Sequence, residues 1–109
     1  MKTTFTVRHL DNDSMAKEYF KDRSAGLSKH VKRFKDELVY LHGTLEKNPH
    51  KEEFYATLSL FLPTMALHCR EKGDDYAFAL NLAFQDIIRQ IEKHVDKLNR
   101  EKRRSVRRQ

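Results

Sequence analysis

The sequence is poor in the residue types on which several common sites depend. Among its 109 residues there is one cysteine, Cys69, with no tryptophan, three glycines and two prolines. A single cysteine excludes an intramolecular disulfide framework and a cysteine-cluster zinc site. Three isolated glycines do not form a glycine-rich phosphate loop. No apolar run approaches the roughly 20 residues that span a bilayer.

What remains is typical of one small folded domain. Hydrophobic residues make up 39% of the chain and mean hydropathy is −0.81, yet seven Phe and four Tyr supply enough large side chains for a core. The first residues alternate in polarity and carry charges, unlike the apolar segment of a signal peptide. We therefore expect a cytoplasmic protein.

Positive charge is unevenly distributed along the chain. There are 22 Lys and Arg against 16 Asp and Glu, a net charge of +6. Residues 100–109 contain six basic residues and one acidic, and thus five of the six net charges. A second basic concentration spans residues 21–35. Such clusters attract phosphates of a polyanion or an anionic membrane, although a lysine-rich helix face is also common as plain solvated surface. We predict a domain over 1–100 and a flexible basic tail over 101–109.

Periodicity predicts the N-terminal elements. Residues 2–8 alternate like a half-buried strand, and Asp13 is the expected N-cap of a helix over 14–34. One face of that helix is apolar and the opposite face is cationic. The apolar positions are Ala16, Phe20, Leu27, Val31 and Phe34.

The rest of the chain predicts three strands and a long helix. Residues 38–46, 53–62 and 65–71 are apolar or alternating, with loops at Asn48–His50 and Pro63–Thr64. Asp74 or Asp75 is expected to cap a final helix that begins near 75 and runs to 102 or beyond, with one apolar stripe. The fold class is thus α+β in the order β-α-β-β-β-α, a four-stranded sheet with two helices packed on one face.

The available chemistry does not favour catalysis. The six histidines spread over several elements and no two stand four apart on a helix, so we expect no metal site. His68 and Cys69 are adjacent on a predicted strand and point to opposite faces, so they cannot pair as base and nucleophile. We expect no enzyme activity, no cofactor and no small-molecule substrate.

Three aromatic residues have two readings each. Tyr76 and Phe78, at the start of the last helix, could stack on bases, but core packing is favoured. Phe61 falls on the polar face of its strand, where it either covers the open side of the sheet or meets a partner. The double-stranded-RNA-binding domain has a related element order, but Asp74 and Asp75 stand where its second helix begins with lysines.

Collinear motifs resemble one family. The segment 73–81, Gly-Asp-Asp-Tyr-Ala-Phe-Ala-Leu-Asn, and the segment 88–98, Ile-Arg-Gln-Ile-Glu-Lys-His-Val-Asp-Lys-Leu, are similar to two motifs of one bacterial family. It is the family of the hibernation-promoting factor and the ribosome-associated inhibitor (protein Y), and the chain resembles its short form over about residues 2–100. Gly26 and Asp86 stand where that family usually has lysine, and the family's tyrosine position falls on Ala77.

The resemblance implies a translation inhibitor that binds the decoding region of the small ribosomal subunit. It would contact 16S rRNA, cover the mRNA and the A- and P-site tRNA positions, and hold ribosomes inactive under stress or in stationary phase. Whole ribosomes or ribosome dimers are further partners in this hypothesis, and a membrane is not. Matching positions in the family's helices make Arg23, Arg33, Arg89, Lys93 and Lys97 candidate rRNA-binding residues. Helix-face geometry adds Lys29 and Lys32. The basic tail adds Arg100, Lys102, Arg103, Arg104, Arg107 and Arg108.

An alternative remains open at this stage. The same fold could serve as a non-ribosomal RNA-binding module or as a homodimeric interaction module. Phe61 on the open sheet face is the main sequence feature in favour of the homodimer.

Overall fold

The computed structural model describes the backbone of residues 1–107 and the side chains of residues 1–102. Its elements follow the predicted order, with two short 3₁₀ helices added between the first helix and the second strand. They are β1 (Lys2–Arg8), α1 (Ser14–Ser28), η1 (Lys29–Val31), η2 (Asp36–Leu38), β2 (Tyr40–Lys47), β3 (Phe54–Phe61), β4 (Ala66–Gly73) and α2 (Tyr76–Arg107).

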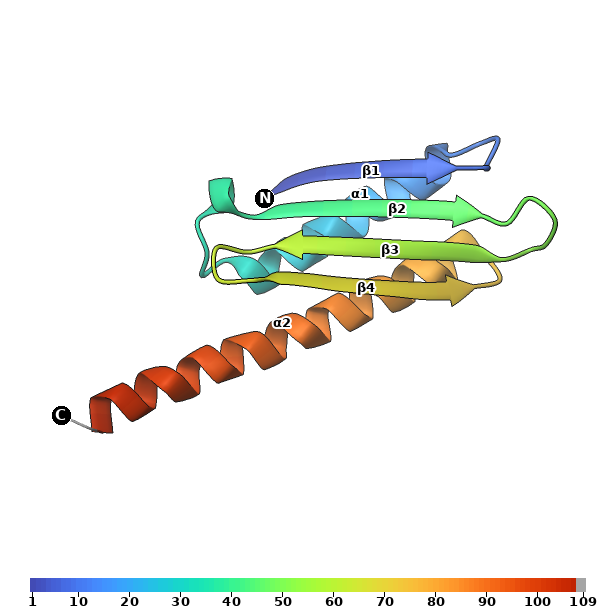
Figure 1. The fold of residues 1–109 in the computed structure, drawn as a ribbon. Coiled ribbons are helices and arrows are strands. Elements are labelled where there is room, and N and C mark those ends of the chain that lie inside the picture. Colours follow the sequence, from blue (N-terminus) through green and yellow to red (C-terminus); the bar gives the residue numbers. More distant parts are fainter. Residues whose placement is uncertain (108–109) are drawn as a thin grey trace.

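The four strands form one sheet in the spatial order β1-β2-β3-β4. Strand β1 pairs in parallel with β2, whereas β2–β3 and β3–β4 are antiparallel. A parallel pair needs a crossover connection, and α1 supplies it. Both helices lie behind the sheet in Figure 1, so the described residues cover one face and leave the other open. The predicted α+β arrangement with both helices on one face is confirmed.

Helix α1 begins where predicted, but the Asp13 side chain does not cap it. Asp13 occupies the N-cap position without a side-chain cap; its carboxylate instead lies 3.1 Å from the Lys17 ammonium. The Asn12 side-chain oxygen accepts hydrogen bonds from the Ser14 backbone N–H (3.3 Å) and hydroxyl (2.9 Å). The predicted end at residue 34 is wrong, because the backbone tightens into η1 after Ser28.

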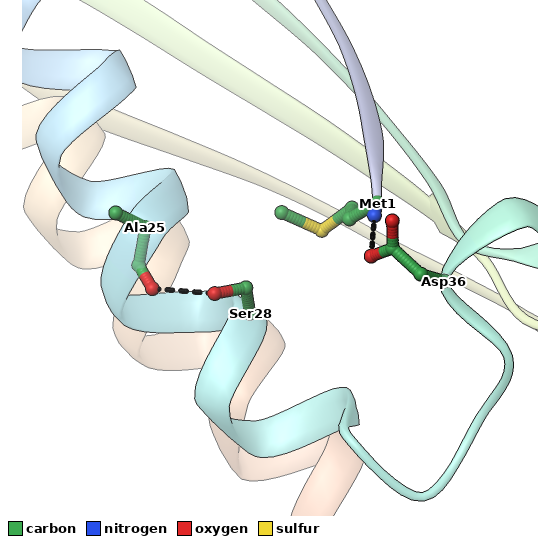
Figure 2. Close-up of polar contacts among 4 residues, drawn as sticks. All are labelled: Met1, Ala25, Ser28 and Asp36. Carbon is green, nitrogen blue, oxygen red and sulfur yellow. Dashed lines mark hydrogen bonds and ion pairs between the residues drawn. The ribbon is translucent and has the colours of Figure 1, made fainter.

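The connection from α1 to β2 is tied back to the chain start. Figure 2 shows the amino group of Met1 paired with the Asp36 carboxylate, close to α1, where the Ser28 hydroxyl donates to the Ala25 carbonyl at 2.6 Å. Leu38, predicted to begin the second strand, is exposed and belongs to η2. Strand β2 begins only at Tyr40 because η2 turns the chain parallel to β1.

The core lies between the sheet and the two helices. Phe20 of α1 stacks on Phe5 of β1 with ring centroids 4.3 Å apart, and its ring also packs against Phe84 of α2 at 5.6 Å. Gly43 lies beneath Phe20, where any Cβ would be only 2.5 Å from the ring. The inward face of β3, predicted from its alternation, is buried throughout: Phe54, Ala56, Leu58 and Leu60, with Leu62 just beyond it.

Helix α2 carries its apolar stripe along the sheet and then extends past it. The Asp75 carboxylate accepts a hydrogen bond from the Phe78 backbone N–H at 2.7 Å, which identifies the cap. Tyr76 is half-buried against Tyr19. The core position predicted for Phe78 is wrong, because its side chain is 50% exposed.

In the part of the chain that the structure describes, no helix is both long and apolar enough to cross a membrane.

The C-terminal part of α2 projects beyond the sheet, as Figure 1 shows, and gives the molecule extents of 61 × 24 × 17 Å. Since α2 includes residues as far as Arg107, the predicted tail of 101–109 begins within the helix. Residues 108 and 109, and the side chains after Lys102, lie outside the described residues.

Candidate nucleic-acid interface

The first group of predicted cations comes from α1 and the turn after it. Arg23 lies in α1, Lys29 in η1, and Lys32 and Arg33 directly follow η1; all four are exposed. Arg23 is held over the Tyr19 ring, 5.1 Å from its centroid, and donates to the Tyr19 hydroxyl at 3.0 Å. These contacts fix the direction of the guanidinium while leaving its charge uncompensated.

The second group lies along α2. Arg89, Lys93 and Lys97 follow one another at intervals of four residues and so occupy neighbouring turns of one face, which Arg100 continues. All four side chains are exposed. Lys102 is also exposed, but two residues after Arg100 it points to nearly the opposite side of the helix. Asp96 shares the face of Arg89 and Lys93 and reduces its net charge.

A groove between the two helices brings parts of both groups together. Its volume is about 480 Å³, and Arg23 and Lys29 line it from the side of α1 and η1. Asn81, Gln85 and Ile88 line it from α2, and Gly26 and Leu27 line it from α1. A Cβ added to Gly26 would meet nothing within 4 Å. The groove therefore has room for a side chain at one position where the family that the sequence resembles has lysine.

A second groove lies between α2 and the β3–β4 turn. It measures about 510 Å³ and is lined by Lys93 and Lys97 together with Met65, Leu67 and Leu98. The imidazole Nε2 of His94 and the hydroxyl of Thr64 lie 2.6 Å apart and join the two walls. The lysines thus stand on the rim of an apolar hollow rather than on a flat surface.

None of the predicted cations among the described side chains forms an ion pair, although Asp22 lines the first groove and Glu101 the second. Within residues 1–102, the ion pairs involve Met1, His9, Lys17, Lys47 and Lys72, and none involves a predicted binding residue. Exposed pairs of this kind contribute little in any case. The predicted cations thus keep their charges available to a polyanion.

Asp86 lies in a different environment from that expected. The sequence places it on the outer face of α2, where its charge would repel phosphate. The side chain is half-buried, and its charge acts on β4: burial first, and then Asp86, raise the pKa of the Cys69 thiol to about 12. Cys69 is buried, with its sulfur 3.2 Å from the Ala83 carbonyl oxygen, and has the properties of a small core residue.

The structure joins some predicted residues and separates others. Arg23 and Lys29 share the inter-helix groove, Lys93 and Lys97 share the second groove, and Arg33 reaches α2 through Asn99. Arg100 and Lys102 lie farther along α2. The side chains of Arg103, Arg104, Arg107 and Arg108 lie outside the described residues.

Further polar residues of the inter-helix groove were not among the predicted binding residues. His30, Asn81 and Gln85 line it. The spacing of Asn81, Gln85 and Ile88 at i, i+4 and i+7 was the available signal, since it places all three on one side of a helix. In the described part of the chain, no group of three His, Cys, Asp or Glu side chains is arranged to hold a metal ion.

Comparison with known proteins identifies the family and the fold. Residues 3–99 match the family model described as Sigma 54 modulation protein / S30EA ribosomal protein. The fold is similar to the crystal structure of the Thermus thermophilus Protein Y N-terminal domain, with a TM-score of 0.69 and 17% identity over 86% of this chain and 99% of that one. It is also similar to a ribosomal subunit interface protein from Coxiella burnetii, with a TM-score of 0.66 and 15% identity over 88% and 99%. No curated protein sequence matches significantly.

Proposed function

Because the chain belongs to the Sigma 54 modulation protein / S30EA ribosomal protein family, we propose that it is a ribosome-associated translation inhibitor of the cytoplasm. It binds the small subunit at the decoding region, contacts 16S rRNA there, and keeps ribosomes inactive during stress or stationary phase. The observation that carries the proposal is the groove between α1 and α2, which Arg23 and Lys29 line. Arg33, which bonds to Asn99 of α2, and the cations from Arg89 to Lys97 continue the basic surface on either side.

Inhibition in this proposal comes from occupancy rather than from a chemical step. Lys and Arg are protonated at neutral pH, so each one placed against an rRNA phosphate releases a condensed counterion. A body 61 Å long and 24 Å by 17 Å across, bound at the decoding region, would compete with mRNA and with the A- and P-site tRNAs for the same space. Release then depends on salt and on competing ligands, with no covalent change to the ribosome.

Co-sedimentation with purified small subunits tests the proposal. The wild-type protein should travel with the subunits at low salt and dissociate as salt rises, with a slope of about 0.9 or less per phosphate contact. The double variant Lys93→Glu/Lys97→Glu should abolish binding, because it places two carboxylates where the second groove presents cations. Wild-type protein that stays at the top of the gradient at low salt contradicts the proposal.

A matched control has the same change in net charge at a distant site. Lys47→Glu/Lys51→Glu alters the β2–β3 hairpin, which lies at the end of the sheet away from the C-terminus in Figure 1. This variant should bind subunits nearly as well as wild type. Deletion of residues 102–109 should weaken binding without abolishing it, since the helices provide the shaped contact. Equal loss from the deletion and from the Lys93/Lys97 variant would assign most of the binding to the basic tail.

A further inference from the structure

The face of the sheet opposite the helices carries a continuous series of rings. Tyr40 and His42 of β2 lie nearly parallel with centroids 6.5 Å apart, and Tyr40 also contacts Phe61 of β3 at 5.9 Å. Phe61 in turn meets His68 of β4 edge-to-face at 6.0 Å. We refer to Tyr40, His42, Phe61 and His68 as the aromatic row. It crosses three strands, and Phe61 is 42% exposed at its centre.

Hydrogen bonds orient three of these rings. The Thr4 hydroxyl of β1 lies 2.7 Å from the Tyr40 hydroxyl and 2.6 Å from Nδ1 of His42. Nδ1 of His68 lies 2.9 Å from the Ser59 hydroxyl. Rings held in this way lose little further conformational freedom when a flat ligand stacks on them.

Basic residues surround the aromatic row. The strand alternation that directs Thr4 and His68 to this face also directs Lys2 and Arg8 of β1, and Arg70 and Lys72 of β4, to it. Glu46 is the one acidic residue within the four strands on this face, and it lies 3.8 Å from the His9 imidazole. Directly before β3, the Glu53 carboxylate lies 3.2 Å from the Lys72 ammonium and compensates its charge. Arg70 is stacked over the Tyr55 ring, 4.9 Å from its centroid. The open face therefore combines π-surfaces with net positive charge.

The composition of this face favours a nucleic acid over a second copy of the chain. Beside the Tyr40 and Tyr55 rings, Phe61 and Ala66 are the only apolar side chains that the four strands direct to it, so two such faces brought together would bury mostly polar groups. Two-fold pairing would also bring Lys2, Arg8 and Arg70 of both copies into one interface. A single strand of RNA matches both features, because its bases stack on aromatic rings and its phosphates attract Lys and Arg.

We propose that the open sheet face binds an unpaired segment of RNA, with bases stacked on Phe61 and Tyr40 and phosphates held by Lys2, Arg8 and Arg70. This surface lies on the opposite side of the sheet from the helices that the proposed function uses. The inference rests on that function only in naming RNA as the polymer. A protein held to the subunit by its helices would still present this face to a neighbouring single strand.

Fluorescence anisotropy with a labelled single-stranded RNA of about 12 nucleotides tests the proposal at low salt. Phe61→Ala should weaken binding about tenfold, the loss typical of one stacked base, whereas Phe61→Tyr should keep the wild-type affinity. Phe78→Ala is the matched control, because it removes a similarly exposed phenylalanine from α2 and should have no effect. Arg70→Gln should reduce the salt slope by about 0.7.

A photo-crosslinking readout does not depend on the affinity of any variant. RNA that contains 4-thiouridine should crosslink to peptides of β2 and β3 in the wild-type protein. Crosslinks confined to α1 and α2, or equal affinities of wild type and Phe61→Ala, would overturn the proposal. So would a dimer in sedimentation equilibrium that Phe61→Ala dissociates without a change in RNA affinity.

The two proposals can fail separately. Phe61-dependent oligonucleotide binding by a protein that does not sediment with small subunits sustains this inference and refutes the ribosomal function. Subunit binding that depends on Lys93 and Lys97, with no oligonucleotide affinity that depends on Phe61, sustains the ribosomal function and refutes this inference.

Discussion

The Arg33 guanidinium donates a hydrogen bond to the side-chain oxygen of Asn99 at 3.4 Å, although the two residues are 66 positions apart. The contact joins the turn after η1 to the late part of α2, and so connects the two basic surfaces. Arg33 also lies over the Phe34 ring, 5.8 Å from its centroid. Neutral partners therefore orient the Arg33 guanidinium, and its charge stays available to a phosphate.

Asn99→Asp should lower the affinity for small subunits. The new carboxylate would form an ion pair with Arg33 and neutralise the cation that the amide only orients. We expect a loss of about two- to fivefold and a salt slope smaller by roughly one contact. Asn99→Ala is the control, since it removes the hydrogen bond and adds no charge; it should change affinity by less than about twofold. Equal losses in the two variants would mean that orientation of Arg33, rather than its charge, matters.

Gly26→Lys should both stabilise the protein and strengthen subunit binding. The position is helical, and space for a side chain is open, so replacing glycine raises the free energy of unfolding by about 0.5–1 kcal/mol. The lysine adds a cation to the inter-helix groove. Gly26→Glu should give a similar rise in thermal stability with weaker binding. If both variants bind alike in co-sedimentation, the groove does not contact rRNA.

Gly43→Ala should have the opposite effect on stability. Its Cβ would stand 2.5 Å from Cε2 of Phe20 and 3.2 Å from a methyl carbon of Leu58. Phe20 is stacked on Phe5 and cannot withdraw without loss of that contact. Such overpacking costs about 1–3 kcal/mol, measurable by urea denaturation. A Gly43→Ala protein as stable as wild type would show that the Phe20 ring shifts freely.

The Cys69 thiol should be inert in the folded protein. Burial, together with the charge of Asp86, raises its pKa from 9.0 to about 12, so the native thiol stays neutral at pH 8. The Cys69 thiol ionises at lower pH in the unfolded chain than in the native protein. Its contribution to the free energy of unfolding is therefore lost as pH rises from about 9 to about 12. Iodoacetamide should label Cys69 rapidly only in denaturant. Asp86→Asn should move the thiol titration to lower pH, and an unmoved titration would exclude the influence of Asp86.

The secondary structure was largely predictable because it depends on local periodicity. The strict alternation of β3 and the apolar stripe of α2 identify both elements and their buried faces, since only one register puts those side chains in a core. The end of α1 was not predictable in this way. Its apolar spacing continues to Phe34, but the need to turn toward β2 ends the helix at Ser28.

The sequence also could not decide the environments of single side chains. Phe78 has the hydrophobicity of a core residue, yet α2 directs it outward over Gly73, where the first turn lies at the edge of the domain. Asp86 shares a face with Arg89 by spacing alone, but packing of α2 against β4 brings its charge close enough to affect Cys69. Both outcomes depend on how the helix is rotated against the sheet.

The sequence by itself determined the fold class, the family and the cationic faces of the helices. These follow from residue order, because amphipathic periodicity and collinear motifs are properties of the chain. Only the tertiary structure decided which cations share a groove, that Gly26 leaves one open, and that the aromatic row lies exposed on a basic sheet face. The physical reason is that these features join residues far apart in the chain, through strand register and helix packing that no local pattern encodes.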